Sequence, residues 1–588
     1  MARLIFLILL LHVTLFSNGQ QGKEIKIIFT NDLHSRLAGY SPESAYSPLT
    51  INDDSTKGGF ARIATIIRTE KEAGGTTVVV DAGDFLMGTL FQALEVENGF
   101  QLRLMKQMGY DAVAIGNHEF DYGPEKLAAI IGSATQNGSI PDVFLGNIEF
   151  DSRDTGDDAL ELLAEKNILK RSVIIEKDNL KLGIFSLLGK VADENAAFAK
   201  PVSFSGQVKA ARKIVSELRQ QGCDLVICLS HSGVTRYSDN TWGGEDVELA
   251  EKVKGIDVII SGHTHTRIDK PIIVKGIPIV QTGEYGQSVG KLLLTRYDDR
   301  TEVTGYELIP VDDRIQGDPL INSLIETQKE LISEKVLKPA GMSYNTVAGE
   351  ALFPFECNEQ GNFKESNLGP VVADAIQYYV NAHSKEGTDI SMVAVGVIRD
   401  RIVPGVQAVP DIFRVMSMGS GNNNLPGYPL ARLYVTGKEL KNVLEILQVA
   451  YRKAPENYCF YSGIDMIFDP RAGFMKKIKK IEITGKDGRR SVVGFSKGDT
   501  RLYSITANSY MLQFIGIIKK MSFGLINVVP KDAKGNKVQD MKDAVIDMDN
   551  TSPGIQEGRE WLALYEFIRT MKDNDGDGIP EIMGSELK

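Results

Sequence analysis

Between Lys23 and Val311, short apolar segments alternate with helical stretches, and this alternation limits the possible folds more than any other feature of the chain. The apolar segments are rich in Val, Ile and Leu, which is typical of buried strands. Strands separated by helices favour a layered α/β domain. The predicted strands are 25–29, 77–80, 112–115, 143–145, 182–186, 225–229 and 258–260, and the predicted helices among them are 60–73, 99–108 and 205–220.

The chain is too long for one hydrophobic core, because its 588 residues exceed the usual size of a single domain. Residues Pro319–Lys338 predict an amphipathic helix that ends before Pro339 and Gly341. We therefore expect a first domain over residues 23–315, a helical connector over 316–341 and a second mixed α/β domain over 342–588. The apolar stripe expected on the connector helix consists of Leu320, Leu324, Leu331, Ile332 and Val336.

The first nineteen residues have the pattern of an export signal. Arg3 precedes the apolar run Leu4–Phe16, and small residues at Ser17 and Gly19 suit a signal-peptidase cut. The run is too short to span a membrane comfortably, and no second run of spanning length follows. We expect a periplasmic or extracellular protein without a transmembrane segment in the mature chain.

Composition excludes two classes of function. The net charge of −11 gives no basic surface for a nucleic-acid polymer. The four cysteines form no Cys-x-x-Cys motif, which excludes thiolate zinc fingers. Cys223 and Cys228 are expected not to pair, because their spacing points them to opposite faces of a strand. Pairing of Cys357 with Cys459 stays open.

Histidines gather in polar clusters directly after predicted strands. Of the seven histidines, one lies in the export segment and five of the other six lie in such clusters. Imidazole and carboxylate ligands together suit zinc, manganese or iron. The clusters are Asp32-Leu33-His34, Gly83-Asp84, Gly116-Asn117-His118-Glu119, His231-Ser232-Gly233 and Gly262-His263-Thr264-His265.

This ordered set resembles the pattern of calcineurin-like metallophosphoesterases. The first domain further resembles the 5′-nucleotidase family through Thr30–Arg36, Asp81–Asp84 and Gly116–Asp121. The resemblance implies a four-layer α/β domain, a two-sheet sandwich flanked by helices, followed by a mixed α/β C-terminal domain.

The resemblance also implies two divalent ions, zinc or manganese, that share one carboxylate. Such ions lower the pKa of an attacking water and hold a phosphate oxygen. Asp84 is expected to bridge the two ions. The expected ligands of one ion are Asp32, His34, Asp84 and His265, and those of the other are Asp84, Asn117, His231 and His263.

Other residues of the clusters are expected to act on the substrate. The resemblance places His118 opposite the phosphoryl group, and Asp121 suits a role in holding that imidazole in its working tautomer. Asn117 is expected to contact the substrate as well as a metal. Arg36 matches an arginine that contacts phosphate in some family members, although a plain surface charge is an equal alternative. Glu119 is expected to make local hydrogen bonds.

The C-terminal half resembles the 5′-nucleotidase substrate domain only in part. Gly396-Val397-Ile398-Arg399 looks like the end of a Gly-Gly-Ile-Arg motif, so Arg399 is a candidate substrate contact. Tyr510 is the candidate for one base-stacking aromatic ring, with a core tyrosine as the alternative. Ser417-Met418-Gly419 stands where the family often has Pro-Phe-Gly, so the second ring is missing from the expected place.

An acidic segment near the C-terminus resembles the Asp-rich calcium loops of extracellular proteins. Asp573, Asp575 and Asp577 alternate with Asn and Gly, which suits calcium. Gly584 occupies the position where an EF-hand has glutamate, so the match is incomplete. A flexible acidic tail is the equal alternative.

We therefore predict an exported dinuclear-metal phosphoesterase that hydrolyses nucleoside 5′-phosphates to nucleoside and phosphate. A 2′,3′-cyclic-nucleotide phosphodiesterase, a UDP-sugar pyrophosphatase or a sulfur-ester hydrolase would keep the same metal site. A non-catalytic metal-stabilised binding protein is the alternative from another class, and His118 with Asp121 argue against it, since neither is needed merely to hold metal.

Overall fold

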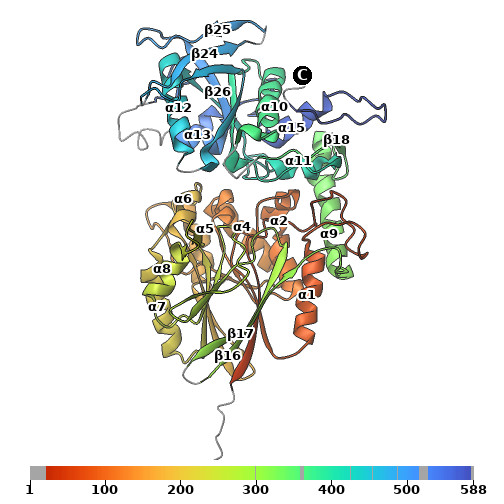
Figure 1. Cartoon of the computed structure of the whole chain (residues 1–588), viewed down its shortest axis with the longest axis vertical. Coiled ribbons are helices and arrows are strands. Elements are labelled where there is room, and N and C mark those ends of the chain that lie inside the picture. Colours follow the sequence, from red (N-terminus) through yellow and green to blue (C-terminus); the bar gives the residue numbers. More distant parts are fainter. Residues whose placement is uncertain are drawn as a thin grey trace, which may run out of the picture.

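The computed structural model describes residues 22–584 apart from 298–299, 358–362, 424, 453–454, 474, 486–487 and 516–527. Two domains are stacked along the long axis of the molecule, one built from each half of the chain (Figure 1). The export segment predicted over residues 1–19 lies outside the described residues. None of the described helices combines the length and apolar character that crossing a bilayer requires.

The N-terminal domain contains two large sheets in its described part. Parallel pairing of consecutive strands through crossover helices gives both sheets a mostly parallel centre. Antiparallel pairs lie at one edge of the first sheet and at both edges of the second. In spatial order the first sheet consists of β17 (Thr301–Pro310), β16 (Ser288–Arg296), β1 (Lys23–Thr30), β2 (Thr76–Asp81), β3 (Ala112–Ala114), β4 (Asp142–Phe144) and β6 (Leu169–Lys170). The second sheet consists of β14 (Ile272–Val274), β15 (Ile277–Val280), β13 (Val258–Ser261), β10 (Leu225–His231), β8 (Leu180–Leu188) and β7 (Ser172–Lys177).

Helices cover the outer faces of both sheets. The larger ones are α1 (Phe60–Glu72), α3 (Phe100–Met108) and α4 (Pro124–Asn137) on the first sheet, and α7 (Gln207–Gln220) and α8 (Glu245–Lys252) on the second. Shorter elements are η1 (Leu90–Leu94), α2 (Glu95–Asn98), η2 (His118–Tyr122), β5 (Ile148–Glu149), η3 (Thr155–Asp157), α5 (Asp158–Glu165), α6 (Lys190–Asn195), β9 (Ser203–Phe204), β11 (Thr235–Arg236) and β12 (Trp242–Gly243).

Strand alternation explains why four layers form. Ile27 and Phe29 of β1 point into the space between the two sheets, whereas Ile28 packs under the helices of the first sheet. Successive side chains of a strand point to opposite faces, so an uninterrupted apolar strand fills a core on each side. Figure 1 shows α1 on one flank and α7 with α8 on the other. The predicted four-layer sandwich is confirmed.

The connector between the domains is helical, and its predicted buried stripe is partly wrong. It comprises α9 (Pro319–Ile332), η4 (Ser333–Leu337) and η5 (Lys338–Ala340), which run along one edge of the molecule (Figure 1). Leu320 is 62% exposed and Leu331 is 38% exposed. The buried face consists of Ile321, Ile325, Gln328, Ile332 and Val336, so Ile332 and Val336 of the predicted stripe are buried as expected.

The C-terminal domain is mixed α/β, as predicted. Its main sheet has the order β21 (Leu430–Thr436), β26 (Leu502–Asn508), β19 (Ile390–Ala394) and β22 (Cys459–Ser462). Smaller sheets contain β18 (Val347–Ala351) with β20 (Gly405–Ala408), and β23 (Ile464–Phe468) with β24 (Ile478–Thr484) and β25 (Arg490–Val492). The longer helices are α10 (Leu368–His383), α11 (Val409–Val415), α12 (Gly437–Ala450), α13 (Ser509–Ile515) and α15 (Glu560–Arg569), and the short turns are η6 (Phe363–Glu365), η7 (Val395–Val397), η8 (Pro455–Asn457) and η9 (Met541–Ala544).

No disulfide joins any two of the four cysteines, all of which lie in the described part of the chain. Cys223 and Cys228 are therefore unpaired, as expected, and the open pairing of Cys357 with Cys459 is not formed.

Candidate metal centre

The histidine and aspartate clusters meet at the carboxyl ends of the parallel strands. β1, β2 and β3 run parallel in the first sheet, and β10 and β13 run parallel in the second. The carboxyl ends of parallel strands share one edge, where an α/β fold gathers its functional groups. Because the two sheets face each other, ligands from both sheets converge between them.

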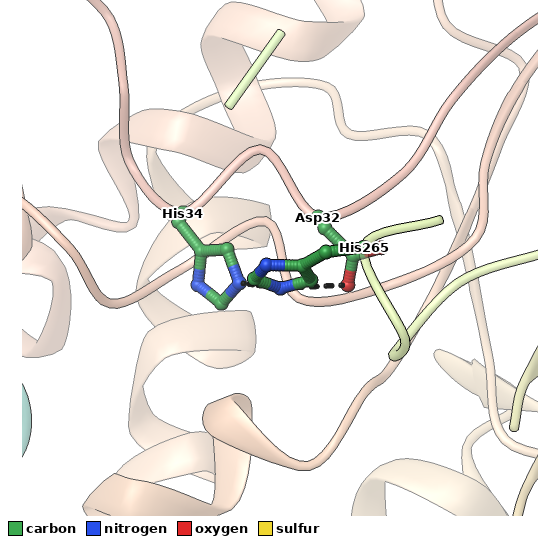
Figure 2. Close-up of side chains that lie close together, drawn as sticks. All are labelled: Asp32, His34 and His265. Atoms are coloured by element: carbon green, nitrogen blue, oxygen red, sulfur yellow. Dashed lines mark hydrogen bonds and ion pairs between the residues drawn. The ribbon is translucent and has the colours of Figure 1, made fainter. Parts of the chain in front are cut away.

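One group of ligand atoms comes from Asp32, His34 and His265. A carboxylate oxygen and two ring nitrogens lie within 4.8 Å of one another. The Nε2 atoms of His34 and His265 are 3.1 Å apart, and Nε2 of His265 is 3.8 Å from Asp32 Oδ1. Figure 2 shows the three side chains pointing toward one another.

The outer nitrogens of these two imidazoles are hydrogen-bonded away from the group. His34 Nδ1 donates to the Met87 carbonyl at 2.9 Å, and His265 Nδ1 contacts the Glu284 carboxylate. With both protons on Nδ1, both Nε2 atoms face each other as lone pairs. Two lone pairs 3.1 Å apart repel unless a cation lies between them, so this arrangement fits a metal ion.

A second group comes from Asp84, His231 and His263, whose ligand atoms also lie within 4.8 Å of one another. His231 Nδ1 donates to the Ala82 carbonyl at 2.9 Å, which again directs Nε2 inward. That Nε2 atom lies 3.2 Å from the Asn117 amide oxygen. Carboxylate, imidazole and amide oxygen together form a donor set for a first-row divalent ion.

Asp84 lies between the two groups. Its Oδ2 atom is 3.0 Å from His231 Nε2 and 3.9 Å from His34 Nε2. One carboxylate within reach of both groups is the arrangement that a bridged pair of metal ions requires.

Electrostatics in the centre favour a bound cation. Burial lowers the pKa of His34 well below its ordinary value and lowers that of His263 to about 3, so both rings are neutral ligands. Burial alone would also lower the pKa of His231, but the Asp84 carboxylate, together with Asp32 and the Ala82 carbonyl, outweighs burial and raises this pKa to about 10. The space between Asp84 and His231 therefore attracts positive charge strongly.

The backbone at the ligands is held in an unusual conformation. Asp32, His34, Asp84, His263 and His265 have φ values of 50°, 49°, 55°, 75° and 51°. Non-glycine residues at such φ cost of order 1 kcal/mol or more each, and they gather at functional sites. Sharp left-handed turns directly after the strands turn these side chains into the space between the sheets.

Two neighbouring carboxylates have local roles. Glu119 accepts hydrogen bonds from the backbone N–H groups of Gly116, Leu86 and Asp84 at 2.6, 2.9 and 3.2 Å, which agrees with the role expected for it. Asp81 accepts from the Thr30 hydroxyl at 2.6 Å and from the Gly83 N–H at 2.9 Å. Both residues shape the turns that carry the ligands.

His118 and Asp121 form a pair beside the ligands. Asp121 Oδ2 lies 2.8 Å from His118 Nδ1, and the His118 ring centroid is 5.3 Å from that of His34. The His118 backbone N–H also donates to Asp84 Oδ1 at 2.9 Å. The His118 side chain is 15% exposed, so part of this ring is accessible beside the ligands.

A cavity of about 830 Å³ lies between the two domains beside His265. Arg36 and Arg399 both line it, so the structure brings these two predicted substrate contacts together. Arg36 is not a plain surface charge, because it is only 5% exposed and pairs with Asp400 across the domain interface. Its guanidinium also lies 4.2 Å from the centroid of the Tyr285 ring.

Tyr510 lies at the domain interface and stacks on a second tyrosine. Its ring centroid is 5.3 Å from that of Tyr428 at an interplanar angle of 11°. Phe198 from the N-terminal domain packs on both rings, with centroids 5.7 Å from Tyr428 and 6.4 Å from Tyr510. Met418 is buried in the core, and the aromatic ring that lies against Tyr510 in the C-terminal domain is that of Tyr428.

The acidic segment near the C-terminus forms a compact loop. Asp573 accepts from the N–H groups of Gly576 and Gly578 at 2.7 and 2.9 Å. The carboxylates form two groups with ligand atoms within 4.8 Å, which are Asp573 with Asp575 and Glu581, and Glu350 with Asp575 and Asp577.

Several residues of the site were not anticipated from the sequence. Glu284 and Tyr285 flank His265 and Arg36, and they follow β15 as the other clusters follow their strands. That shared position could have identified them. Asp400 and Tyr428 reach the site through contacts between the two domains. Sequence periodicity predicts helices and strands and does not predict such contacts.

Comparison with known proteins agrees with this geometry. Residues 25–267 match the calcineurin-like phosphoesterase family, and residues 346–516 match the 5′-nucleotidase C-terminal domain. A snake venom 5′-nucleotidase from Naja atra is 27% identical over 481 residues, which are 76% of this chain and 82% of that protein. The trifunctional nucleotide phosphoesterase protein YfkN of Bacillus subtilis is 25% identical over 518 residues, 83% of this chain, and this chain spans only 32% of its length.

The fold as a whole is shared with a solved structure. The crystal structure of a 5′-nucleotidase precursor from Thermus thermophilus has a TM-score of 0.66 and 21% identity, and the match covers 95% of this chain and 99% of that one. Both family matches, the named relatives and this shared two-domain fold lead to one conclusion. The chain belongs to the 5′-nucleotidase family, in which a calcineurin-like phosphoesterase domain is joined to a 5′-nucleotidase C-terminal domain, and it is a phosphoric ester hydrolase.

Proposed function

We propose that the chain hydrolyses nucleoside 5′-phosphates to nucleoside and phosphate at a dinuclear metal centre. The observation that carries this proposal is the pair of ligand groups joined by Asp84, with His118 and Asp121 directly beside them. The family relatives named as 5′-nucleotidases support the choice of substrate.

The proposed ligands are the seven residues named from the sequence. Two zinc or manganese ions held there would lower the pKa of the attacking water and neutralise charge on the phosphate. Their donors are the carboxylates and inward Nε2 atoms described above, together with the Asn117 amide oxygen, which we also expect to face the substrate. The full set is Asp32, His34, Asp84, Asn117, His231, His263 and His265.

His118 is the proposed catalytic histidine. Asp121 holds a proton on Nδ1, which leaves Nε2 to face the phosphoryl group. From there the imidazole stabilises developing negative charge or protonates the leaving oxygen. Arg36 and Arg399 line the adjoining cavity and would contact the phosphate, because a guanidinium fork matches phosphate oxygens.

Tyr510 is the proposed aromatic contact for the nucleoside base. Its ring already stacks on Tyr428 with a centroid separation of 5.3 Å, which leaves no space for a base between the two rings. A base therefore stacks on an outer face of this pair rather than inside it.

Hydrolysis of a panel of esters, followed by chromatography of the products, tests the proposal, because a cyclic nucleotide or a UDP-sugar can be cleaved without release of free phosphate. The panel contains 5′-AMP, a 3′-nucleotide, 2′,3′-cyclic AMP, UDP-glucose and an aryl phosphate, with manganese or zinc added. We expect preference for 5′-AMP. Preference for cyclic AMP or UDP-glucose would identify one of the related activities instead, and activity on the aryl phosphate alone would place the natural substrate outside the nucleotides.

A His118→Ala variant separates an enzyme from a metal-stabilised binding protein. We expect the variant to keep its metal content and to lose phosphate release, since His118 is not a proposed ligand. Wild-type protein that binds both ions and releases no phosphate from any ester would support the binding protein.

We also propose that the acidic loop binds calcium through Asp573, Asp575 and Asp577. The support is the cluster of carboxylates, to which Glu350 brings a ligand from a distant segment. Calcium should raise the unfolding temperature of the wild type and not that of an Asp575→Asn variant. An equal response of both proteins would favour a plain acidic tail.

Export and domain limits complete the proposal. We propose that residues 1–19 direct export, and N-terminal sequencing of secreted or periplasmic protein should then begin near Gln20.

We propose domains over 23–315 and 342–588 with the connector 316–341, because the strands of the two large N-terminal sheets end by Pro310 and β18 begins at Val347. Limited proteolysis should cut between these ranges before it cuts inside them.

A further inference from the structure

A turn of the C-terminal domain, of which residues 416–423 and 425–429 are described, folds back on itself against the N-terminal domain. The Gly427 N–H donates to the Gly419 carbonyl, and the Tyr428 N–H donates to the Met418 carbonyl, both at 2.9 Å. Tyr428 therefore stands at the returning end of the turn, in a position fixed by backbone hydrogen bonds on both sides of the loop.

Two side chains of the N-terminal domain hold this turn. Gln92 of η1 donates to the Ser417 carbonyl at 2.8 Å, and Lys126 of α4 donates to the Gly421 carbonyl at 3.1 Å. The backbone carbonyl of Gln92 also accepts from the Tyr122 hydroxyl at 2.9 Å. Tyr122 is the last residue of η2, which carries His118 and Asp121, so the turn is held by elements directly beside the segment of the proposed catalytic pair.

The Tyr428 ring has little freedom to move. It stacks on Tyr510, packs against Phe198 and lies directly on Gly419, where a Cβ atom would overlap the ring. Gly419 also has a φ of 85°, so this close approach and this backbone conformation both require glycine.

The Asp121 carboxylate is near enough to the Tyr428 hydroxyl to act on its pKa. Tyr428 is only 3% exposed, and among the described residues no group accepts a hydrogen bond from this hydroxyl at normal length. Burial, and after it the nearby Asp121 carboxylate, raises the pKa of Tyr428 well above its ordinary value, so the hydroxyl keeps its proton and serves as a donor. A buried donor without a partner is costly, which favours a hydrogen bond from this hydroxyl to the nearby Asp121 carboxylate.

We propose that Tyr428 is a positioning residue, whose hydroxyl donates to Asp121 and thereby fixes the Asp121–His118 pair from the opposite domain. The inference rests on the proposed role of His118. Hydrogen bonds of catalytic groups are often long in a free enzyme and tighten when substrate binds. A carboxylate held from two sides keeps the imidazole in one orientation, and it does so only while the domains are docked as they are here.

The matched variants are Tyr428→Phe, which removes the hydroxyl and keeps the stacked ring, and Tyr379→Phe, which removes another buried hydroxyl of the same domain. Tyr379 lies in α10, where its ring packs on His383 at 4.6 Å, away from the pair. Steady-state kinetics are measured with 5′-AMP and with an aryl phosphate, so that one substrate has no base to stack.

We expect Tyr428→Phe to lower kcat about tenfold or more on both substrates, while KM changes by less than about twofold, since a hydrogen bond to a charged group is lost. Tyr379→Phe should keep the wild-type kcat. A loss confined to 5′-AMP, or a change in KM alone, would show that Tyr428 is only part of the wall for the base and would overturn the proposal.

A double-mutant cycle gives a readout that needs no activity. Urea unfolding midpoints are compared for Tyr428→Phe, Asp121→Asn and the double variant. If the hydroxyl and the carboxylate interact, the double variant should shift by less than the sum of the single shifts. Additive shifts would refute the contact between Tyr428 and Asp121, whether or not the wild type hydrolyses any of the esters. Non-additive shifts in a wild type that hydrolyses none of the esters would support the contact and refute only the proposed function.

Discussion

Replacing Gly116 by alanine tests whether Asp84 is the shared ligand of the metal centre. A Cβ atom on residue 116 would lie 2.6 Å from the backbone nitrogen of Asp84 and 2.8 Å from its Cγ atom. Ordinary contacts of carbon atoms begin near 3.5 Å, so Asp84 would have to move by about 1 Å. A displacement of that size in a reacting site costs roughly 100-fold in rate.

The assay for Gly116→Ala combines metal content with phosphate release. We expect the variant to bind less than two ions per chain and to lose about two orders of magnitude in kcat/KM. Gly132→Ala is the matched control, because Gly132 lies inside α4 and a Cβ atom there meets nothing within 4 Å. The control should keep full activity and gain up to about 1 kcal/mol in the free energy of unfolding. Wild-type activity with two bound ions in Gly116→Ala would refute the assignment of Asp84.

Three further perturbations have definite expected outcomes. Burial raises the pKa of Glu560 from near 4.5 to about 8, so the unfolded chain releases this proton first and the folded state loses stability as pH rises between these values. Glu560→Gln has no such proton to lose. The free energy of unfolding of the variant minus that of the wild type should therefore increase by about 3 kcal/mol between pH 5 and pH 7. A difference that stays constant over this pH range would contradict the burial argument. Asp400→Ala should lower the free energy of unfolding measured in urea by about 3 kcal/mol or more, because it leaves the buried guanidinium groups of Arg36 and Arg414 without this partner. A loss below about 1 kcal/mol would show that water takes the place of the Asp400 carboxylate. Chelation should abolish phosphate release, and added manganese or zinc should restore it; activity that survives complete metal removal would contradict a metal-dependent reaction.

Positions next to strand ends could be predicted from the sequence, whereas contacts between domains could not. The clusters around Asp32, Asp84 and His231 follow apolar strands, and parallel strands place their carboxyl ends together whatever the rest of the chain does. Tyr428 and Asp400 come into the site only through docking of the second domain. No periodic pattern in the sequence predicts how the two domains dock.

The connector helix shows a second limit of sequence reasoning. Its apolar residues cover two adjoining faces, one with Leu320 and Leu331 and one with Ile321 and Ile325. A helical repeat shows that the helix is amphipathic, but packing against the N-terminal domain chooses which of two neighbouring stripes is buried.

The most direct test of the dinuclear centre is an anomalous-difference map of crystals grown with manganese. The proposed ligands predict two peaks about 3.5–4 Å apart, one against Asp32, His34 and His265 and the other against His231 and His263, with the Asp84 carboxylate between them. A single peak, or two peaks that do not share Asp84, would contradict the account.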